Sequence, residues 1–195
     1  MTRTIYRDFH ATQAGIAQLL GIREGDAVWE SGVGAGFFLE ALDEFGNKSL
    51  RLGGADTSEG MLAAARARLQ RHPQHAFYHA DARNLTASSV PGLRALRQQY
   101  DKAVAFSVFQ YFPTDRDAAV AADAMVDLVK DGGVVFVGNV YDEAAKPISV
   151  GSLEMMHREG CTPSREASLG VRENACVVSS RHAHSCPLAH AYRHT

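Results

Sequence analysis

Hydrophobic residues follow two alternating patterns over the first three quarters of the chain. Short apolar runs typical of buried strands occur at residues 27–30, 50–56, 76–80, 100–108 and 134–138. Before and between them, apolar residues recur at helical spacing over residues 8–21, 37–45, 59–71, 91–99 and 115–129. Strands that alternate with helices predict βαβ units. The sequence therefore predicts an α/β fold with a doubly wound, mostly parallel sheet and helices on both faces.

The pattern fails after residue 146. Residues 147–195 hold five of the nine histidines, all three cysteines and few large apolar residues. Only residues 153–156, as part of a helix, and residues 175–178, as a lone strand, give a local signal. We therefore expect one domain over residues 1–146. The segment 147–195 is expected to be irregular, either partly disordered or a divergent end of the same domain.

Two expectations follow for the end of the sheet and for assembly. If the terminal strands are incomplete, residues 134–138 form an exposed apolar edge, because nothing pairs with the last strand. Exposed strand edges of this kind tend to pair with another chain. This favours a homodimer or another protein partner.

Charge and composition narrow the other partners. The formal net charge is −2, so a nucleic-acid partner is not expected. No run of about 18 apolar residues occurs and the first residues lack the apolar stretch of a signal peptide, which predicts a cytoplasmic protein with no membrane partner. The odd number of cysteines fits a reducing compartment. Their spacing from the nearby histidines matches no regular zinc motif, so no metal site is predicted.

The richest local signal is the run Glu-Ser-Gly-Val-Gly-Ala-Gly at residues 30–36. Its glycines, Gly32, Gly34 and Gly36, lie between a predicted strand and a predicted helix. Glycines at this place let the backbone approach a ligand, and the helix start directs free amides toward it. Asp56 ends the second predicted strand, where an acid suits the hydroxyls of a ribose. Together these features predict a site for a nucleoside cofactor.

The charge at this run separates two cofactors. A dinucleotide fingerprint has the spacing G-x-G-x-x-G, whereas this run has G-x-G-x-G preceded by Glu30. A carboxylate there would repel the pyrophosphate of NAD, but it suits the ammonium and sulfonium of S-adenosylmethionine. We therefore favour S-adenosylmethionine, with an NAD-type oxidoreductase as the less favoured alternative.

Residues 27–145 resemble the class I S-adenosylmethionine-dependent methyltransferases, which have a Rossmann-like fold. The resemblance is carried by ordered segments at residues 30–36, 54–62, 79–82, 105–112 and 128–133. It implies that Asp56 binds the ribose, that Met61 lies beside the adenine, and that Asp81 accepts the adenine amine. The implied cofactor site comprises Glu30, Gly32, Gly34, Gly36, Asp56, Thr57, Met61, Asp81, Ala82 and Phe106.

Simpler roles stay open for several of these side chains. Asp56 could only cap the following helix, Asp81 could only pair with the neighbouring Arg83, and Met61 could belong to the core. For the methyl acceptor, the segment after the fourth strand nominates Gln110 and Tyr111. The leading segment adds His10, which could act as a base or could be an ordinary exposed histidine.

The function expected from these features is methyl transfer from S-adenosylmethionine to a small-molecule acceptor by in-line displacement. The sequence nominates no firm general base, so the catalytic residues are unknown at this stage. Residues 107–110 lack the Asn/Asp-Pro-Pro-aromatic signature of amide or adenine methylation, and no Pro-Cys pair for cytosine C5 methylation occurs there. The alternative is a non-catalytic protein that binds S-adenosylmethionine or a partner through the same fold.

Overall fold

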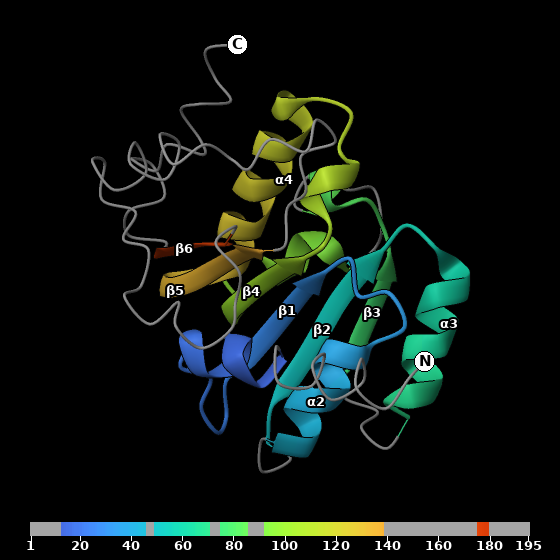
Figure 1. Ribbon diagram of the computed structural model, residues 1–195, viewed down its shortest axis with the longest axis vertical. Coiled ribbons are helices and arrows are strands. Elements are labelled where there is room, and N and C mark those ends of the chain that lie inside the picture. Colours follow the sequence, from blue (N-terminus) through green and yellow to red (C-terminus); the bar gives the residue numbers. More distant parts are fainter. Residues whose placement is uncertain (1–12, 46–48, 71–74, 86–91, 139–174, 180–195) are drawn as a thin grey trace.

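A single mixed sheet organises the described part of the chain. The structure is a computed structural model and describes residues 13–45, 49–70, 75–85, 92–138 and 175–179 (Figure 1). The sheet has the order β3-β2-β1-β4-β5-β6. Its strands are β1 (Ala27–Ser31), β2 (Arg51–Asp56), β3 (Ala76–His79), β4 (Tyr100–Phe106), β5 (Val129–Gly138) and β6 (Ala175–Ser179). The first five strands are parallel and β6 is antiparallel to β5. The order reverses between β1 and β4, and ligands of open α/β sheets bind at the carboxyl ends beside such a point.

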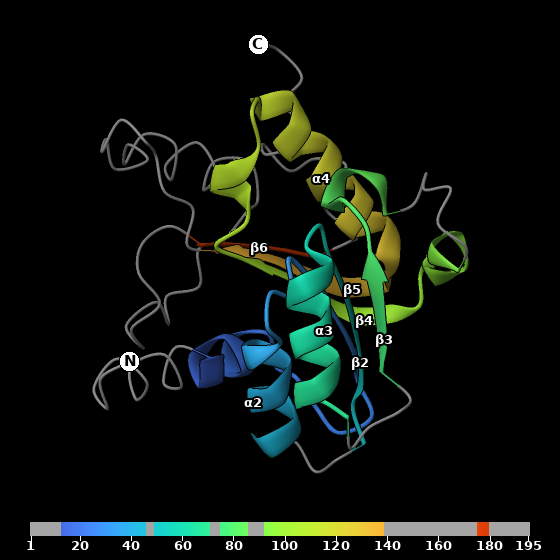
Figure 2. The same ribbon diagram turned by 90° about the vertical axis from the view of Figure 1, so that its right-hand side faces the viewer.

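Helices cover both faces of the sheet, as predicted. The α-helices are α2 (Phe37–Phe45), α3 (Glu59–Arg68) and α4 (Asp115–Leu128), and residues 13–19 are also helical. Three short 3₁₀ segments, η1 (Ala82–Asn84), η2 (Leu93–Leu96) and η3 (Phe109–Tyr111), complete the described elements. The helix over 13–19, α2 and α3 pack in one apolar cluster with the strands, and η1, η2 and α4 pack in another. Figure 2 shows α2 and α3 on one side of the strands and α4 on the other.

The central strand β1 explains why the predicted strand runs are continuously apolar. Every residue of β1 is buried, because helices cover both faces of the sheet. Val28 packs on the side of α2 and α3, whereas Trp29 packs on the side of α4. The ring of Trp29 meets that of Tyr100 edge to face at 5.2 Å, and its Nε1–H donates to the Ser31 hydroxyl at 3.0 Å. The side chains of Trp29 and Ser31 are therefore paired with each other, whereas Glu30 of the same strand keeps one oxygen unpaired.

Two predicted elements need correction. The Asp-Gly-Gly run at residues 131–133 predicts a tight turn before the strand at 134–138, but β5 runs without interruption from Val129. Tyr100 pairs with Val129 while Lys102 already pairs with Val134, so the turn residues are accommodated as an irregularity within the ladder. The helix predicted at 91–99 is only the short η2, which begins after Gly92 in a left-handed conformation.

The end of the sheet also differs from expectation. The strand predicted at residues 175–178 is not alone, because β6 pairs with β5 from Val134 to Gly138. The apolar edge that favoured a homodimer is therefore covered by this chain's own strand. The helical signal at 153–156 lies outside the described residues.

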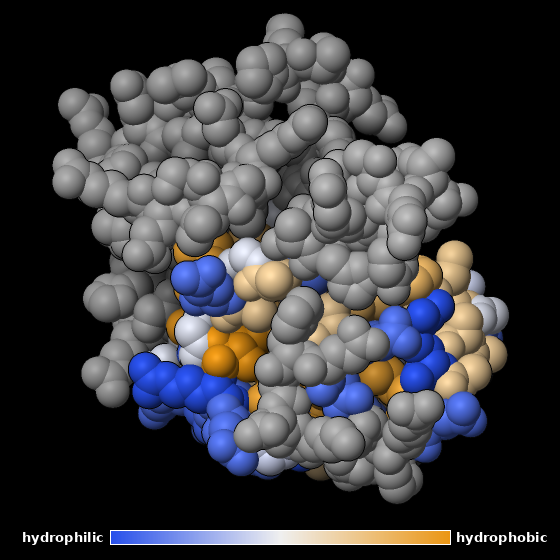
Figure 3. Space-filling view, turned by 60° about the horizontal axis from the view of Figure 1, so that its bottom comes forward, coloured by the Kyte–Doolittle hydropathy of each residue, from blue (hydrophilic) through white to orange (hydrophobic). Residues whose placement is uncertain are grey.

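The described surface carries few large apolar side chains. Met61, Tyr111 and Val120 are the exposed large hydrophobic residues within it. In Figure 3, hydrophobic and hydrophilic residues are interspersed over the described part of one face. Across the described residues, none of the helices has both the length and the apolar character needed to cross a membrane.

Candidate functional site

The predicted site residues come together where β1, β2 and β4 end. Within the sheet, Glu30 of β1 lies between Gly54 of β2 and Val104 of β4. The loop after β1 then bends over the end of β2, because the amides of Gly32 and Val33 both donate to the Ala55 carbonyl, at 2.8 and 3.1 Å. The structure thus places the glycine run at the carboxyl edge of the sheet, beside the strand reversal.

The three glycines of this loop have different surroundings. Gly32 has φ +76°, and a Cβ there would overlap the side chain of Val108, which follows β4. Gly36 lies against α3, where a Cβ would come within 3.1 Å of Ala65. Gly34 has φ +54°, yet nothing lies within 4 Å of the position its Cβ would take. Packing therefore explains glycine at the first and third positions, whereas the second borders open space.

Asp56 fixes the loop from the end of β2. Its Oδ2 accepts the Gly34 amide at 2.8 Å, and its Oδ1 accepts the Ser58 amide at the start of α3, also at 2.8 Å. Ser58 is the N-cap residue of α3, and its hydroxyl accepts the Met61 amide. Each carboxylate oxygen has a second lone pair. The side chain can therefore hold the loop and still accept hydrogen bonds from the hydroxyls of a ribose.

Glu30 is the electrostatic anomaly of the site. The residue is only 5% exposed, and its Oε2 is buried with no hydrogen-bond partner. Burial, and secondarily the negative charge of Asp56, raise the pKa of the Glu30 carboxyl well above its usual value of 4.5. Buried polar groups are normally paired, and an unpaired carboxylate is costly unless something positive neutralises it. Strongly perturbed carboxyls of this kind cluster at functional sites.

A family comparison agrees with this geometry. The model of the methyltransferase domain family matches residues 29–135, more than half of the 195 residues. The chain belongs to the methyltransferase domain family. The predicted Rossmann-like fold of the class I S-adenosylmethionine-dependent methyltransferases is thereby confirmed. No curated protein matches the sequence of this methyltransferase domain.

Solved structures with the same fold share little sequence with this methyltransferase domain. The N-methyltransferase NodS from Bradyrhizobium japonicum WM9, in complex with S-adenosyl-l-homocysteine, is 22% identical with a TM-score of 0.54, over 68% of this chain and 60% of NodS. The amino pentose methyltransferase CalS10 from Micromonospora echinaspora, bound to S-adenosylmethionine, is 21% identical with a TM-score of 0.57, over 74% of this chain and 58% of CalS10. The cyclase SpnF is 20% identical with a TM-score of 0.56, over 72% of this chain and 48% of SpnF.

The three solved chains are longer than this chain, and they do not share one kind of reaction. The chain spans only 48–60% of the length of these three solved chains. A cyclase also shares the fold, so the reaction must be argued from the site and not from the architecture.

Asp81 of the methyltransferase domain already has a partner. Its carboxylate accepts hydrogen bonds from the backbone and the guanidinium of Arg83, which in turn reaches Asp117 of α4. Asp81 is also the N-cap of η1, whose first residue is Ala82. The simpler role that the sequence left open for Asp81 is thus present, and one lone pair of the carboxylate stays available, as shown below.

The segment after β4 of the methyltransferase domain borders the glycine loop. Ser107 adopts φ +60°, a strained conformation for a residue other than glycine, directly after the half-buried Phe106. Its amide donates to the Gly138 carbonyl at 2.9 Å, which joins the ends of β4 and β5. In η3, the Oε1 atom of Gln110 is buried without a partner, whereas Tyr111 is 78% exposed. Phe106 ends β4, and Gln110 and Tyr111 follow it in η3, where the Gln110 oxygen is an unpaired acceptor.

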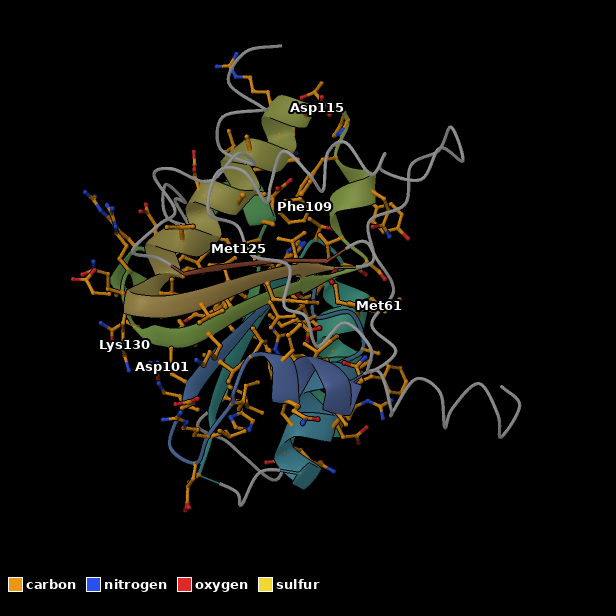
Figure 4. The ribbon with its side chains drawn as sticks, turned by 60° about the vertical axis from the view of Figure 1, so that its left-hand side comes forward. Met61, Asp101, Phe109, Asp115, Met125 and Lys130 are labelled. Carbon is orange, nitrogen blue, oxygen red and sulfur yellow. The ribbon has the colours of Figure 1, made fainter. Side chains whose placement is uncertain are left out.

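The other predicted residues lie at the surface of the methyltransferase domain or outside its described part. Met61 on α3 is 49% exposed, so it is not part of the core (Figure 4). Thr57 is exposed, and its carbonyl oxygen lies 2.9 Å from Nε2 of His79. His10 lies outside the described residues. In the part of the chain that the structure describes, no three His, Cys, Asp or Glu side chains are grouped to hold a metal ion.

Sequence reasoning missed Gln13. This residue is only 2% exposed, and its Oε1 has no hydrogen-bond partner. It lies one turn before Ile16, whose side chain packs on the face of the sheet that also carries Glu30. Its helix leads to the turn at Asp26, whose carbonyl accepts the Arg51 amide at the amino ends of the strands. Gln13 therefore lies at the end of this helix that is farther from the amino ends of the strands. In the sequence, the available signal was a glutamine in line with the apolar stripe of the helix.

Proposed function

We propose that this chain binds S-adenosylmethionine at the carboxyl ends of β1, β2 and β3 and transfers its methyl group to a small organic acceptor. The observation that carries the proposal is Glu30, a buried carboxyl with an unpaired oxygen at the base of a glycine loop. A cationic ligand supplies the missing charge. An anionic pyrophosphate would add repulsion, which disfavours NAD.

The polar groups at this site match the parts of S-adenosylmethionine. Glu30 suits the ammonium group, directly or through water, and the open side of Gly34 gives the ligand room beside the backbone. Asp56 offers its remaining lone pairs to the ribose hydroxyls. Asp81 suits the adenine amine, and the Ala82 amide, at the start of η1, suits an acceptor nitrogen of the ring.

Little further catalytic apparatus is required. The bound cofactor supplies an already activated methyl group, so the chain mainly aligns the acceptor, excludes water and accommodates the proton that the acceptor loses. Within the described residues, Gln110 is the side chain best suited to orient an acceptor, because its buried Oε1 can accept one hydrogen bond from an N–H or O–H group. This favours an amine or a hydroxyl of a small molecule as the acceptor.

A non-catalytic binding protein is the second candidate. It is kept as a candidate because the unpaired oxygen of Glu30 and the contacts of Asp56 support binding of the cofactor but do not by themselves require methyl transfer. Cytoplasmic location and the absence of nucleic-acid and membrane partners stay part of the proposal. The boundary near residue 146 does so too, although β6 joins the sheet of the first segment.

The glycine loop offers a matched test. Gly34 and Gly21 have similar φ values, +54° and +58°, and neither has an atom within 4 Å of a Cβ. Gly34→Ala and Gly21→Ala should therefore destabilise the protein by similar amounts, about 1–2 kcal/mol. Only Gly34→Ala should weaken binding of S-adenosylmethionine in calorimetric titration, because only this methyl group would border the cofactor. Equal affinities in the two variants would contradict the proposed place of the cofactor.

Turnover requires a second assay. The full chain should form S-adenosylhomocysteine when it is incubated with S-adenosylmethionine and a panel of small amines and alcohols. Tight binding with no product across such a panel would favour the non-catalytic candidate.

A further inference from the structure

We propose that Arg83 is a positioning residue for Asp81. Its contacts leave a single acceptor position on the Asp81 carboxylate for the adenine amine, and they thereby set the base specificity of the site. The inference rests on the proposed function, which assigns Asp81 to the adenine amine. Arg83 belongs to none of the sequence motifs that nominate the cofactor site. Its role is inferred from its contacts.

The guanidinium of Arg83 makes a bidentate contact with the carboxylate of Asp81. Oδ1 of Asp81 accepts the Arg83 backbone amide at 2.8 Å and its Nε–H at 3.0 Å. Oδ2 accepts a second guanidinium N–H at 2.6 Å. A carboxylate has about four lone-pair positions. Three are used by Arg83, so a single position, on Oδ2, is left for a ligand.

The contacts with Arg83 fix both the orientation and the charge of the Asp81 carboxylate. The planar guanidinium holds the carboxylate in one orientation, which a flexible lysine ammonium would not do. The hydrogen bond from the Arg83 side chain, which outweighs burial, lowers the pKa of the Asp81 carboxyl. Asp81 is therefore ionised at neutral pH and can only accept a hydrogen bond.

A lone acceptor beside a backbone donor distinguishes purine bases. Adenine presents an amine donor next to the N1 acceptor, which matches Asp81 followed by the amide of Ala82. Hypoxanthine presents a carbonyl oxygen next to an N1–H, so both positions are reversed. Unmatched polar groups in a site built for hydrogen bonds are strongly rejected.

The far side of Arg83 is anchored to α4. Its third guanidinium nitrogen donates to Oδ1 of Asp117 at 2.7 Å. Oδ2 of Asp117 accepts the hydroxyl of Thr114 at 2.6 Å, and Thr114 caps α4 by accepting the Asp117 amide. Arg83 thus lies between two carboxylates, one on the loop after β3 and one on the first turn of α4. The guanidinium cannot swing away from Asp81 without losing its second partner.

The experiment compares two ligands on the full chain and its variants. S-adenosylhomocysteine and S-inosylhomocysteine, which carries hypoxanthine in place of adenine, are titrated calorimetrically into wild type, Arg83→Gln, Arg83→Lys and Asp117→Asn. Arg97→Gln is the matched control, because Arg97 pairs at 3.2 Å with Asp127 near the other end of α4. Far-ultraviolet circular dichroism checks that each variant is folded.

The wild type should prefer the adenosyl ligand by roughly a hundredfold, because both hydrogen-bonding positions of the inosyl base are mismatched. Arg83→Gln should lose about tenfold in affinity for the adenosyl ligand and little for the inosyl ligand, so the preference shrinks. Arg83→Lys should restore the charge without restoring the preference. Asp117→Asn should give a smaller loss of preference, and Arg97→Gln should match wild type.

The outcomes separate this inference from the proposed function. If wild type binds neither ligand, the proposed function fails and the inference with it. If wild type prefers the adenosyl ligand and Arg83→Gln or Arg83→Lys keeps the same ratio, only the role of Arg83 is overturned. A proportional loss for both ligands would indicate a merely structural role and would also overturn it. If Arg83→Gln does not fold, the ratios in Arg83→Lys and Asp117→Asn decide.

Discussion

Two acidic residues on neighbouring strands have opposite electrostatic environments. Asp101 lies near the start of β4, and Glu30 lies near the end of β1. Figure 4 shows Asp101 beside Lys130 at one end of the sheet and Met61 at the opposite end, where α3 begins. The two carboxyls therefore lie at opposite ends of the parallel strands. The side of the sheet where these strands begin is called the amino edge here, and the side where they end is called the carboxyl edge.

At the amino edge, other groups of the protein pair with the carboxylate of Asp101. Oδ2 of Asp101 accepts the Ala27 amide at 2.8 Å, and Oδ1 accepts the Lys130 ammonium at 2.8 Å. Burial raises the pKa of the Asp101 carboxyl, but the hydrogen bonds from Ala27 and Lys130 outweigh it and the pKa is lowered. This carboxylate is stabilised by the fold itself and ties β1 to β4 and β5.

The carboxyl edge leaves a charge unpaired. Glu30 has a raised pKa and an unpaired Oε2, and the loop above it opens at Gly34. At one end of the strands the acid stabilises the fold, whereas at the other end we propose that the acid serves a ligand, at a cost to stability.

The largest effect is expected for Glu30→Gln. Removing a buried charge that faces a cation should weaken S-adenosylmethionine binding roughly a hundredfold. The same substitution should stabilise the unliganded protein at neutral pH. The raised pKa means that the folded state binds more protons than the unfolded state, so wild type loses stability as pH rises from about 4.5 to the raised value.

Calorimetric titration and urea unfolding measure the two effects of Glu30→Gln. The stability difference from wild type should vanish below about pH 4.5. A variant that is both less stable and normal in binding would contradict a ligand role for Glu30.

A smaller effect separates close packing from backbone strain within the glycine loop. Gly32→Ala and Gly21→Ala both place a side chain at positive φ, but only the Cβ at position 32 overlaps Val108. Gly32→Ala should cost about 1–3 kcal/mol more than Gly21→Ala in the free energy of unfolding, since overpacking adds to strain. Chemical denaturation measures this difference. Equal losses would show that the loop can move away from Val108.

The third effect is a pH dependence of cofactor binding. A bound cation favours the ionised form of Glu30, so binding releases a proton wherever the empty site is protonated. Affinity should rise with pH by at most about tenfold per unit between the usual and the raised pKa of Glu30, and then level off. Titrations in buffers of different ionisation enthalpy measure the released proton. Proton uptake, or no release in this range, would break the assignment.

The smallest effect is expected at the other edge. Asp101→Asn should cost about 1 kcal/mol of stability at neutral pH, because a hydrogen bond to a charged group is lost. The lowered pKa means that this stabilisation is present above the unfolded value of about 3.9 and is lost as pH falls through the folded value. Cofactor affinity should stay within about twofold of wild type. A large loss of affinity would erase the contrast between the edges.

The fold was largely predictable because its signals are local. Helix α2 was predicted with its observed limits, and β1 to β3 within a residue or two, since apolar periodicity and glycine mark them directly. The start of β5 was missed because its turn-like glycines fall in an irregularity of the ladder with β4, and Val129 pairs with Tyr100 before them. The pairing of β6 was missed because it joins segments about forty residues apart in a region without a pattern.

The candidate site was predictable in position but not in its contacts. The glycine run and Asp56 gave its place from spacing alone. The unpaired oxygen of Glu30 and the link from Arg83 to Asp117 depend on which side chains meet in space. The buried Gln13 was overlooked because a single glutamine on an apolar stripe carries little weight in a sequence.

We propose that the carboxyl edge is a cation-accepting nucleoside site. Calorimetric titrations of the full chain with S-adenosylmethionine, S-adenosylhomocysteine and NAD, run in parallel, test this assignment. We expect one site that binds both adenosyl ligands and no measurable heat with NAD. Binding of NAD alone would contradict the assignment.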